Sequence, residues 1–196
     1  MQGNPFSEDQ DEEDFILIPI FGTSVLSITN EGYFHQVLTY DYSESTGRYF
    51  NKIQSERDFY VNELRNIRVN MQNFLDDCPN WVNDEEVRPK VLDADIDFRS
   101  SSNPFFYWVI QFRGEFQEGI NEYKSTIEEE KLEYAINSTY IFEPPLMPLD
   151  AKSKMNFDVD RKKRIIRYWA SAGDIVGPTE IITFKQFWFF LELKKF

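Results

Sequence analysis

Residues 91–113, with the sequence VLDADIDFRSSSNPFFYWVIQFR, constrain the fold more than any other stretch. Apolar and acidic side chains alternate through residues 91–98, which predicts a half-buried strand because successive side chains point to opposite faces of a sheet. The polar run 100–104 has the composition of a turn. Residues 105–112 are apolar on both faces until Gln111, which predicts a central strand. We therefore expect a β-hairpin with Leu92, Ala94, Ile96 and Phe98 on its inner face.

A second periodicity covers residues 48–76. Eight positions follow one another at alternating intervals of three and four residues, and all of them except Arg57 are apolar or aromatic. They are Phe50, Ile53, Arg57, Tyr60, Leu64, Ile67, Met71 and Phe74. This spacing predicts one long amphipathic helix. A strand through Ile67, Val69 and Met71 is the alternative, and it matches a shorter segment. The pair Cys78-Pro79 is expected to end the helix.

Several other segments alternate or are rich in β-forming residues. Strands are expected at 15–28, 33–42, 132–142, 156–160, 164–169 and 179–184. Residues 81–90 are expected to form a polar connection and 144–154 a loop, while 114–130 is ambiguous. The predicted fold class is α+β, with a mainly antiparallel sheet or sandwich and one long amphipathic helix at about 48–76. The predicted domain organisation is an acidic arm at 1–14, a single β-rich domain at 15–184 and an aromatic tail at 185–196.

The charge of the chain limits its partners. The formal net charge is -13, which repels phosphate backbones, so we expect no nucleic-acid partner. The first residues lack the basic and apolar regions of a signal peptide, and no apolar run approaches the ~20 residues of a spanning helix. The single Cys78 cannot form an intramolecular disulfide. We expect a protein of the cytoplasm, or of an assembled particle, with no membrane span.

Three alternating carboxylates, Asp93, Asp95 and Asp97, are the first candidate site. Calcium loops also begin with alternate acidic residues, but they need Gly at the sixth position and Glu at the twelfth. The chain has Phe98 and Pro104 at those positions, so an EF-hand is excluded. A weak cation site on a strand and a solvated polar face both fit the pattern.

No sequence motif indicates an enzyme. The chain lacks a G-x-S-x-G motif, a phosphate loop and a dinucleotide fingerprint, and it contains one histidine. We therefore expect no cofactor and favour a non-enzymatic protein. The alternative is a carboxylate-based hydrolase, or a cation-binding β-domain, that acts on carbohydrate. In that case Phe105, Tyr107 and Trp108 would line a sugar groove, whereas the other interpretation places them in the core.

The aromatic C-terminal residues are the second candidate site. Large apolar patches at a chain end are typical of interfaces, so we expect contacts with other protein subunits, or with another copy of the chain; the residues concerned are Phe187, Trp188, Phe189, Phe190 and Phe196. The alternative is that they close the core. The expected function is a non-enzymatic structural or adaptor subunit of a larger assembly, such as a virion or phage-tail component.

One part of the chain resembles a known family. A helix, then the run Arg88-Pro89-Lys90-Val91, then the two strands 91–98 and 105–113 resemble small sheath-initiator subunits of contractile phage tails. The resemblance implies a structural role in an assembly. It carries no individual residue role over to this chain.

Overall fold

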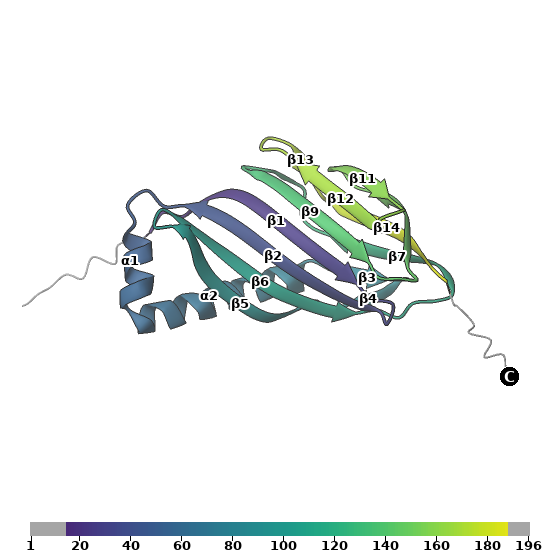
Figure 1. Ribbon diagram of the computed structural model, residues 1–196, viewed down its shortest axis with the longest axis horizontal. Helices are drawn as coiled ribbons and strands as arrows, with labels where there is room; N and C mark the ends of the chain where they lie inside the picture. Colours follow the sequence, from purple (N-terminus) through teal and green to yellow (C-terminus); the bar gives the residue numbers. More distant parts are fainter. Residues whose placement is uncertain (1–14, 188–196) are drawn as a thin grey trace, which may run out of the picture.

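The computed structural model describes residues 15–187 (Figure 1). It is rich in β-structure, with mainly antiparallel strands and two helices, as expected for the fold class. The helices are α1 (Arg48–Ser55) and α2 (Arg57–Asp77). The strands are β1 (Ile18–Ile28), β2 (Tyr33–Ser43), β3 (Asn80–Val82), β4 (Glu85–Val87), β5 (Lys90–Ser100), β6 (Asn103–Arg113), β7 (Gly119–Thr126), β8 (Glu130–Lys131), β9 (Ala135–Phe142), β10 (Met147–Lys152), β11 (Asn156–Asp160), β12 (Ile165–Ala170), β13 (Ile175–Val176) and β14 (Thr179–Gln186).

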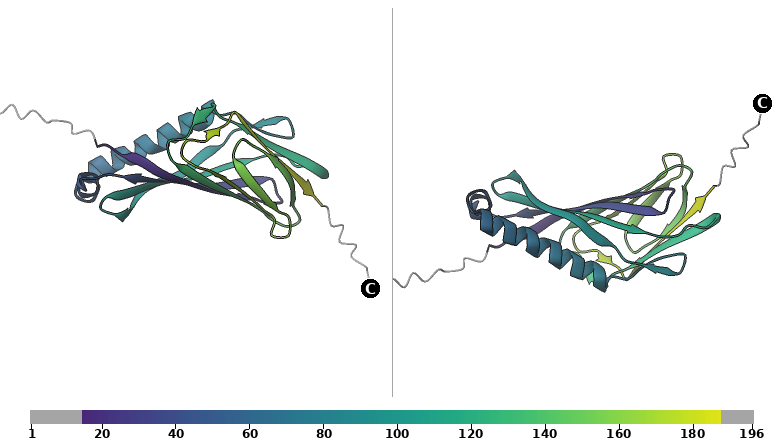
Figure 2. Two further views of the ribbon diagram at one scale, coloured as in Figure 1. Left: turned by 90° about the horizontal axis from the view of Figure 1, so that it is seen from above. Right: turned by 90° about the horizontal axis from the view of Figure 1, so that it is seen from below.

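The strands form two main sheets. The larger sheet has the order β11-β12-β9-β1-β2-β6-β5, and the smaller has the order β10-β14-β7-β3-β4. Strands β8 and β13 form a separate pair. The pairing of β1 with β9 is parallel, while the other pairings are antiparallel. Figures 1 and 2 show the helices at one end of the large sheet and the smaller sheet packed against its other end.

Two large apolar clusters lie against the inner face of the large sheet, and a third, small cluster contains Leu132, Ala170 and Val176. Between the two sheets, Phe34 stacks on Phe112 with 4.5 Å between ring centroids, and Phe184 of the smaller sheet is fully buried. Under the helices, Ile67 and Met71 pack against β5 and β6. The indole nitrogen of Trp108 donates a hydrogen bond to the carbonyl oxygen of Ile67 at 3.0 Å, which ties α2 to β6. The outer face of the large sheet carries neither cluster.

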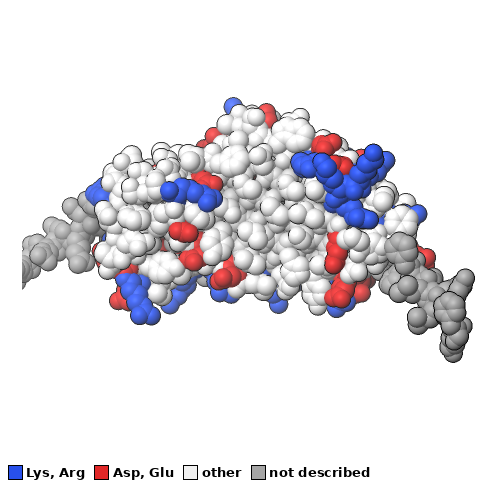
Figure 3. Space-filling view, in the orientation of Figure 1, with Lys and Arg blue, Asp and Glu red and all other residues white. Residues whose placement is uncertain are grey.

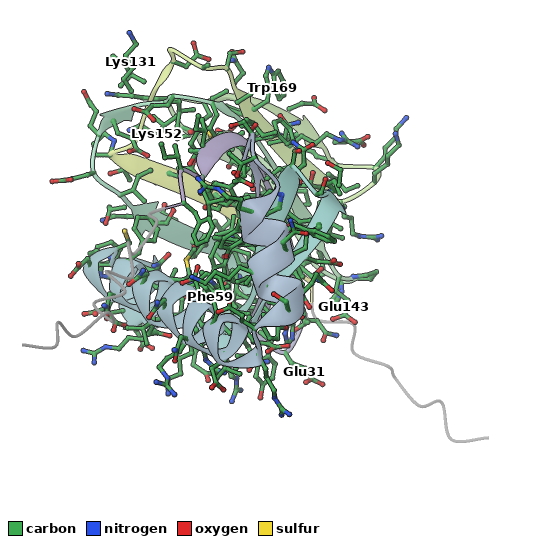
Figure 4. The ribbon with its side chains drawn as sticks, turned by 90° about the vertical axis from the view of Figure 1, so that its left-hand side faces the viewer. Glu31, Phe59, Lys131, Glu143, Lys152 and Trp169 are labelled. Carbon is green, nitrogen blue, oxygen red and sulfur yellow. The ribbon has the colours of Figure 1, made fainter. Side chains whose placement is uncertain are left out.

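The helical segment differs from the single helix expected over 48–76. Glu56 has an extended backbone, with φ -119° and ψ 95°, and it separates α1 from α2. The hydroxyl of Tyr49 donates to the Glu63 carboxylate at 3.0 Å, although these residues are 14 positions apart. In a continuous helix they would be separated by roughly 21 Å. The chain therefore turns at Glu56 to bury Tyr49, and Phe59 lies in this helical end of the molecule (Figure 4).

The hairpin 91–113 is present, with two shifts in its register, one between Val91 and Asp93 and one between Phe98 and Ser100. A bulge between Val91 and Asp93 makes Leu92 an extra residue on β5. Leu92 is 47% exposed, whereas Val91, Ala94 and Ile96 are buried. The expected inner-face position of Leu92 is therefore wrong, because a bulge adds a residue without adding a partner. Strand β6 pairs with β2 on one side and with β5 on the other, so it is an interior strand, one position from the edge of the sheet.

Two connections contain unexpected strands. The expected polar connection 81–90 contains β3 and β4, and the expected loop 144–154 contains β10. Strand β10 pairs with β14 and buries Pro148 and Ala151, and Leu146 just before it is also buried. The predicted strands near 15–28, 33–42, 156–160, 164–169 and 179–184 are confirmed by β1, β2, β11, β12 and β14. Neither α1 nor α2 is both long and apolar enough to cross a membrane.

Candidate functional site

A cavity of about 160 Å³ lies between the two sheets and is partly open to solvent. Strands β1, β2 and β9 form one wall, and β7 and β14 contribute the other. Its surface is mainly apolar, with a few polar groups. The lining residues are Gly22, Thr23, Ser24, Gln36, Leu38, Tyr40, Ser125, Ile127, Ile136, Asn137, Ser138, Met155, Val176 and Glu180.

Glu180 of β14 is the acidic side chain in this lining. It shares the inner face of β14 with the buried Ile182 and Phe184, because residues two positions apart on a strand point to the same side. The Ser153 hydroxyl donates to one Glu180 carboxylate oxygen at 3.1 Å. Within residues 15–187, no lysine or arginine forms an ion pair with Glu180.

The surroundings of Glu180 disfavour its charged form. Burial raises the pKa of its carboxyl group, and hydrogen bonds from Ser153 and Tyr140 partly oppose this effect. The residue as a whole is half-buried because part of its surface faces the cavity. A desolvated carboxylate is stabilised by a nearby cation or by further hydrogen-bond donors. The cavity therefore holds an acidic group whose capacity to accept hydrogen bonds is only partly used.

Buried tyrosines surround this carboxylate. Burial is the main cause of the raised pKa of Tyr140 and Tyr168, and the neighbouring Glu180 charge raises both further. The Tyr168 hydroxyl is buried and has no hydrogen-bond partner among the described residues. The Tyr123 hydroxyl donates to the Asn80 side chain at 2.7 Å. The charge of Glu180 acts on both Tyr140 and Tyr168, and the charge of Asp150 acts on Tyr168 as well.

The opposite wall is formed by uncharged side chains. The Gln36 amide donates to the Ser24 hydroxyl at 2.8 Å, which holds both side chains against the wall. Leu38 lies opposite Ser24 in the β1–β2 pairing. A Cβ atom at Gly22 would lie 2.8 Å from the Tyr40 ring. Any residue with a side chain at position 22 would therefore collide with this ring. The wall combines an apolar surface with hydroxyl and amide groups.

The three candidate aspartates lie apart from the cavity, on the edge strand β5. Asp93 and Asp97 are exposed, and the Tyr60 hydroxyl donates to Asp95 at 2.6 Å. Among the residues that the structure describes, no group of three or more His, Cys, Asp or Glu side chains is arranged to hold a metal ion. The cation site at Asp93, Asp95 and Asp97 stays a prediction.

The candidate aromatic residues lie in three different places. Trp108 is buried, whereas Phe105 and Tyr107 are half-buried and point to the outer face. The Arg99 guanidinium lies 3.9 Å from the centroid of the Phe105 ring. Phe187 follows β14 and is half-buried. The remaining candidate interface residues, Trp188, Phe189, Phe190 and Phe196, lie outside the described residues.

The sequence interpretation missed the cavity and Glu180. The walls of the cavity come from β1, β2, β7, β9 and β14. Because β1 and β2 are far from the other three strands in the chain, the spacing of residues in the sequence does not reveal that they pack together. One local signal was available in the segment TEIITFKQ. Glu180 has the same two-residue period as Ile182, Phe184 and Gln186, which marks an acidic residue on an inward face. A comparison with protein-family models and with curated proteins finds no match for this chain.

Proposed function

We propose that this protein is a binding protein that holds a small, mainly apolar ligand in the cavity between its sheets. The supporting observation is a mainly apolar cavity of about 160 Å³ with a carboxylate in its wall. Protein interiors are normally packed with few voids larger than a water molecule. An apolar cavity of about 150 Å³ is large enough for a benzene molecule. The ligand is therefore a small molecule rather than a drug-sized one.

The energetics also favour a filled cavity. Because the cavity is partly open, its apolar lining faces water, and a ligand that covers this lining gains about 25 cal/mol for each Å² of apolar surface removed from water. A ligand of matching size also makes close contacts between its atoms and the lining. The polar groups of Ser24, Gln36, Ser125, Ser138 and Glu180 would then orient the ligand within an otherwise apolar site.

The first test fills the cavity with a side chain. Leu38→Phe adds a larger side chain at the lining, so we expect the variant to bind benzyl alcohol at least about tenfold more weakly than the wild type. Val37→Phe is the matched control, because Val37 precedes Leu38 on β2 and is 47% exposed. Calorimetric titration of the three proteins with benzyl alcohol measures the effect.

The control must keep the wild-type affinity for benzyl alcohol. Equal binding by the wild type and Leu38→Phe would place the probe elsewhere and contradict the proposal. Absence of binding to the wild type would also contradict it. Far-ultraviolet circular dichroism of each variant shows whether the sheets remain folded.

A second candidate function is that of a structural or adaptor subunit, and the outer face of the large sheet favours it. Val25 and Val37 are neighbours across β1 and β2 and are 39% and 47% exposed. Val109 of β6 continues this row. Figure 3 shows an uncharged area over the middle of this face, with lysines and arginines gathered near β11 and β12. An apolar sheet face of this kind can pack against another protein subunit.

Self-association is the version of this function that can be tested directly. If the outer face joins two copies, Val37→Asp buries two charges in the interface and shifts the protein to monomer. Val61→Asp, on an exposed position of α2, is the control and leaves association unchanged. Sedimentation velocity over a range of concentrations distinguishes the species. A wild type that is monomeric throughout, or a dimer that survives Val37→Asp, contradicts self-association through this face.

A further inference from the structure

We infer that the cavity ligand carries one protonated amine on a small apolar body, and that this amine bonds to the Glu180 carboxylate. The inference rests on the proposed function of the cavity and specifies the class of ligand. It combines three observations, which are the charge in the lining, the unused acceptor capacity of Glu180 and the size of the apolar space.

The first observation concerns charge. Glu180 is the one acidic residue among the described lining residues, and the others have apolar, hydroxyl or amide side chains. No basic side chain within residues 15–187 forms an ion pair with it. A buried carboxylate without a cation is costly, and a cationic partner lowers that cost. The site is therefore complementary to a single positive charge.

The second observation concerns hydrogen bonding. An ionised carboxylate offers about four acceptor positions. Ser153 and Tyr140 supply two hydrogen bonds to Glu180. An ammonium group has three N–H donors, and a charge-assisted hydrogen bond is about twice as strong as a neutral one. The open acceptor positions of Glu180 are thus matched better by an ammonium group than by a hydroxyl.

The third observation concerns size and shape. Apolar side chains from β2 and β9, together with Ile127, Met155 and Val176, provide the contact surface around the carboxylate. A cavity of about 160 Å³ leaves room for roughly one aromatic ring or a short alkyl chain beside the charged group. Larger polyamines would leave a second charge in the apolar part of the cavity. A monoamine with a compact apolar body fits both parts of the site.

Two probes of nearly equal shape test this inference. Benzylamine and benzyl alcohol differ in their charge and in their polar group, while the ring is the same. We expect the wild type to bind benzylamine about tenfold more tightly than benzyl alcohol, or more. Glu180→Gln should lose this preference and bind the two probes with equal affinity, because it has no charge to pair with the amine. Glu122→Gln removes an exposed carboxylate from the neighbouring strand β7 and should leave the preference intact.

The outcomes separate the inference from the proposed function. If the wild type binds both probes equally, or if Glu180→Gln still prefers benzylamine, the amine inference is overturned while the cavity remains a ligand site. If the wild type binds neither probe, the proposed function and the inference both fail. If Glu122→Gln also loses the preference, the effect belongs to the net charge of the protein and the inference is overturned. Binding of benzyl alcohol to Glu180→Gln shows that this variant is folded.

Discussion

Phe34→Ala is expected to lower the free energy of unfolding by about 3–5 kcal/mol, because it removes a large ring from a fully packed position. Phe34 is completely buried between the two sheets. Its ring lies 4.5 Å from that of Phe112, 5.1 Å from that of Tyr123 and 5.9 Å from that of Phe116, measured between centroids. The substitution therefore removes contacts with both sheets, and the residues around it cannot close the space completely.

Urea denaturation of the wild type and the variant measures this loss. His35→Ala is the matched control, since His35 follows Phe34 on β2 and is exposed on the outer face. Its unfolding free energy should change by no more than about 0.5 kcal/mol. If Phe34→Ala costs no more than His35→Ala, the two sheets do not pack through this cluster.

Gly32→Ala is expected to cost about 3 kcal/mol, because two unfavourable effects coincide at the turn between β1 and β2. Gly32 has a φ of 86°, which an L-residue adopts at a cost of about 1–2 kcal/mol. A Cβ atom there would also lie 2.1 Å from the carbonyl oxygen of Gly114. The Gly114 amide donates to the Gly32 carbonyl at 3.0 Å, so relief of the clash would break this contact.

Gly119→Ala separates the two effects. Gly119 has a φ of 93°, but a Cβ atom there would meet no other atom within 4 Å. The free energy of unfolding of this variant should fall only by the cost of the positive φ, about 1–2 kcal/mol. Thermal unfolding of both variants gives the comparison. Equal losses would show that the contact between Gly32 and Gly114 is not a tight one.

Local patterns predicted most strands correctly because burial on one face imposes a two-residue period. The same argument failed at Leu92, where the bulge shifted the pattern. It also failed at β3, β4 and β10, which are short and contain polar residues. Strands β3 and β10 pair with β7 and β14, which lie far away in the sequence, and β4 joins the sheet through β3. Such pairing is a tertiary effect that short-range periodicity does not encode.

The break between the helices had a visible sign in the sequence. Arg57 interrupted the apolar stripe, and it is exposed in the structure at the first position of α2. Tyr49 and Phe59 lay outside the stripe, yet their rings pack 6.0 Å apart at the junction. Two offset apolar faces, rather than one continuous stripe, indicate a bend. Glu180 was harder to recognise, because its significance depends on a wall contributed by other strands.

The most direct measurement of the central claim is a titration of the wild-type protein with benzyl alcohol, followed by its backbone amide resonances. The account predicts concentration-dependent shifts at Ser24, Leu38, Ser125 and Ser138, which line the two walls of the cavity. Amides on the exposed face of α2, such as that of Val61, should not shift. Shifts confined to α2 or to the outer face of the large sheet, or no shifts at all, would contradict a ligand site between the sheets.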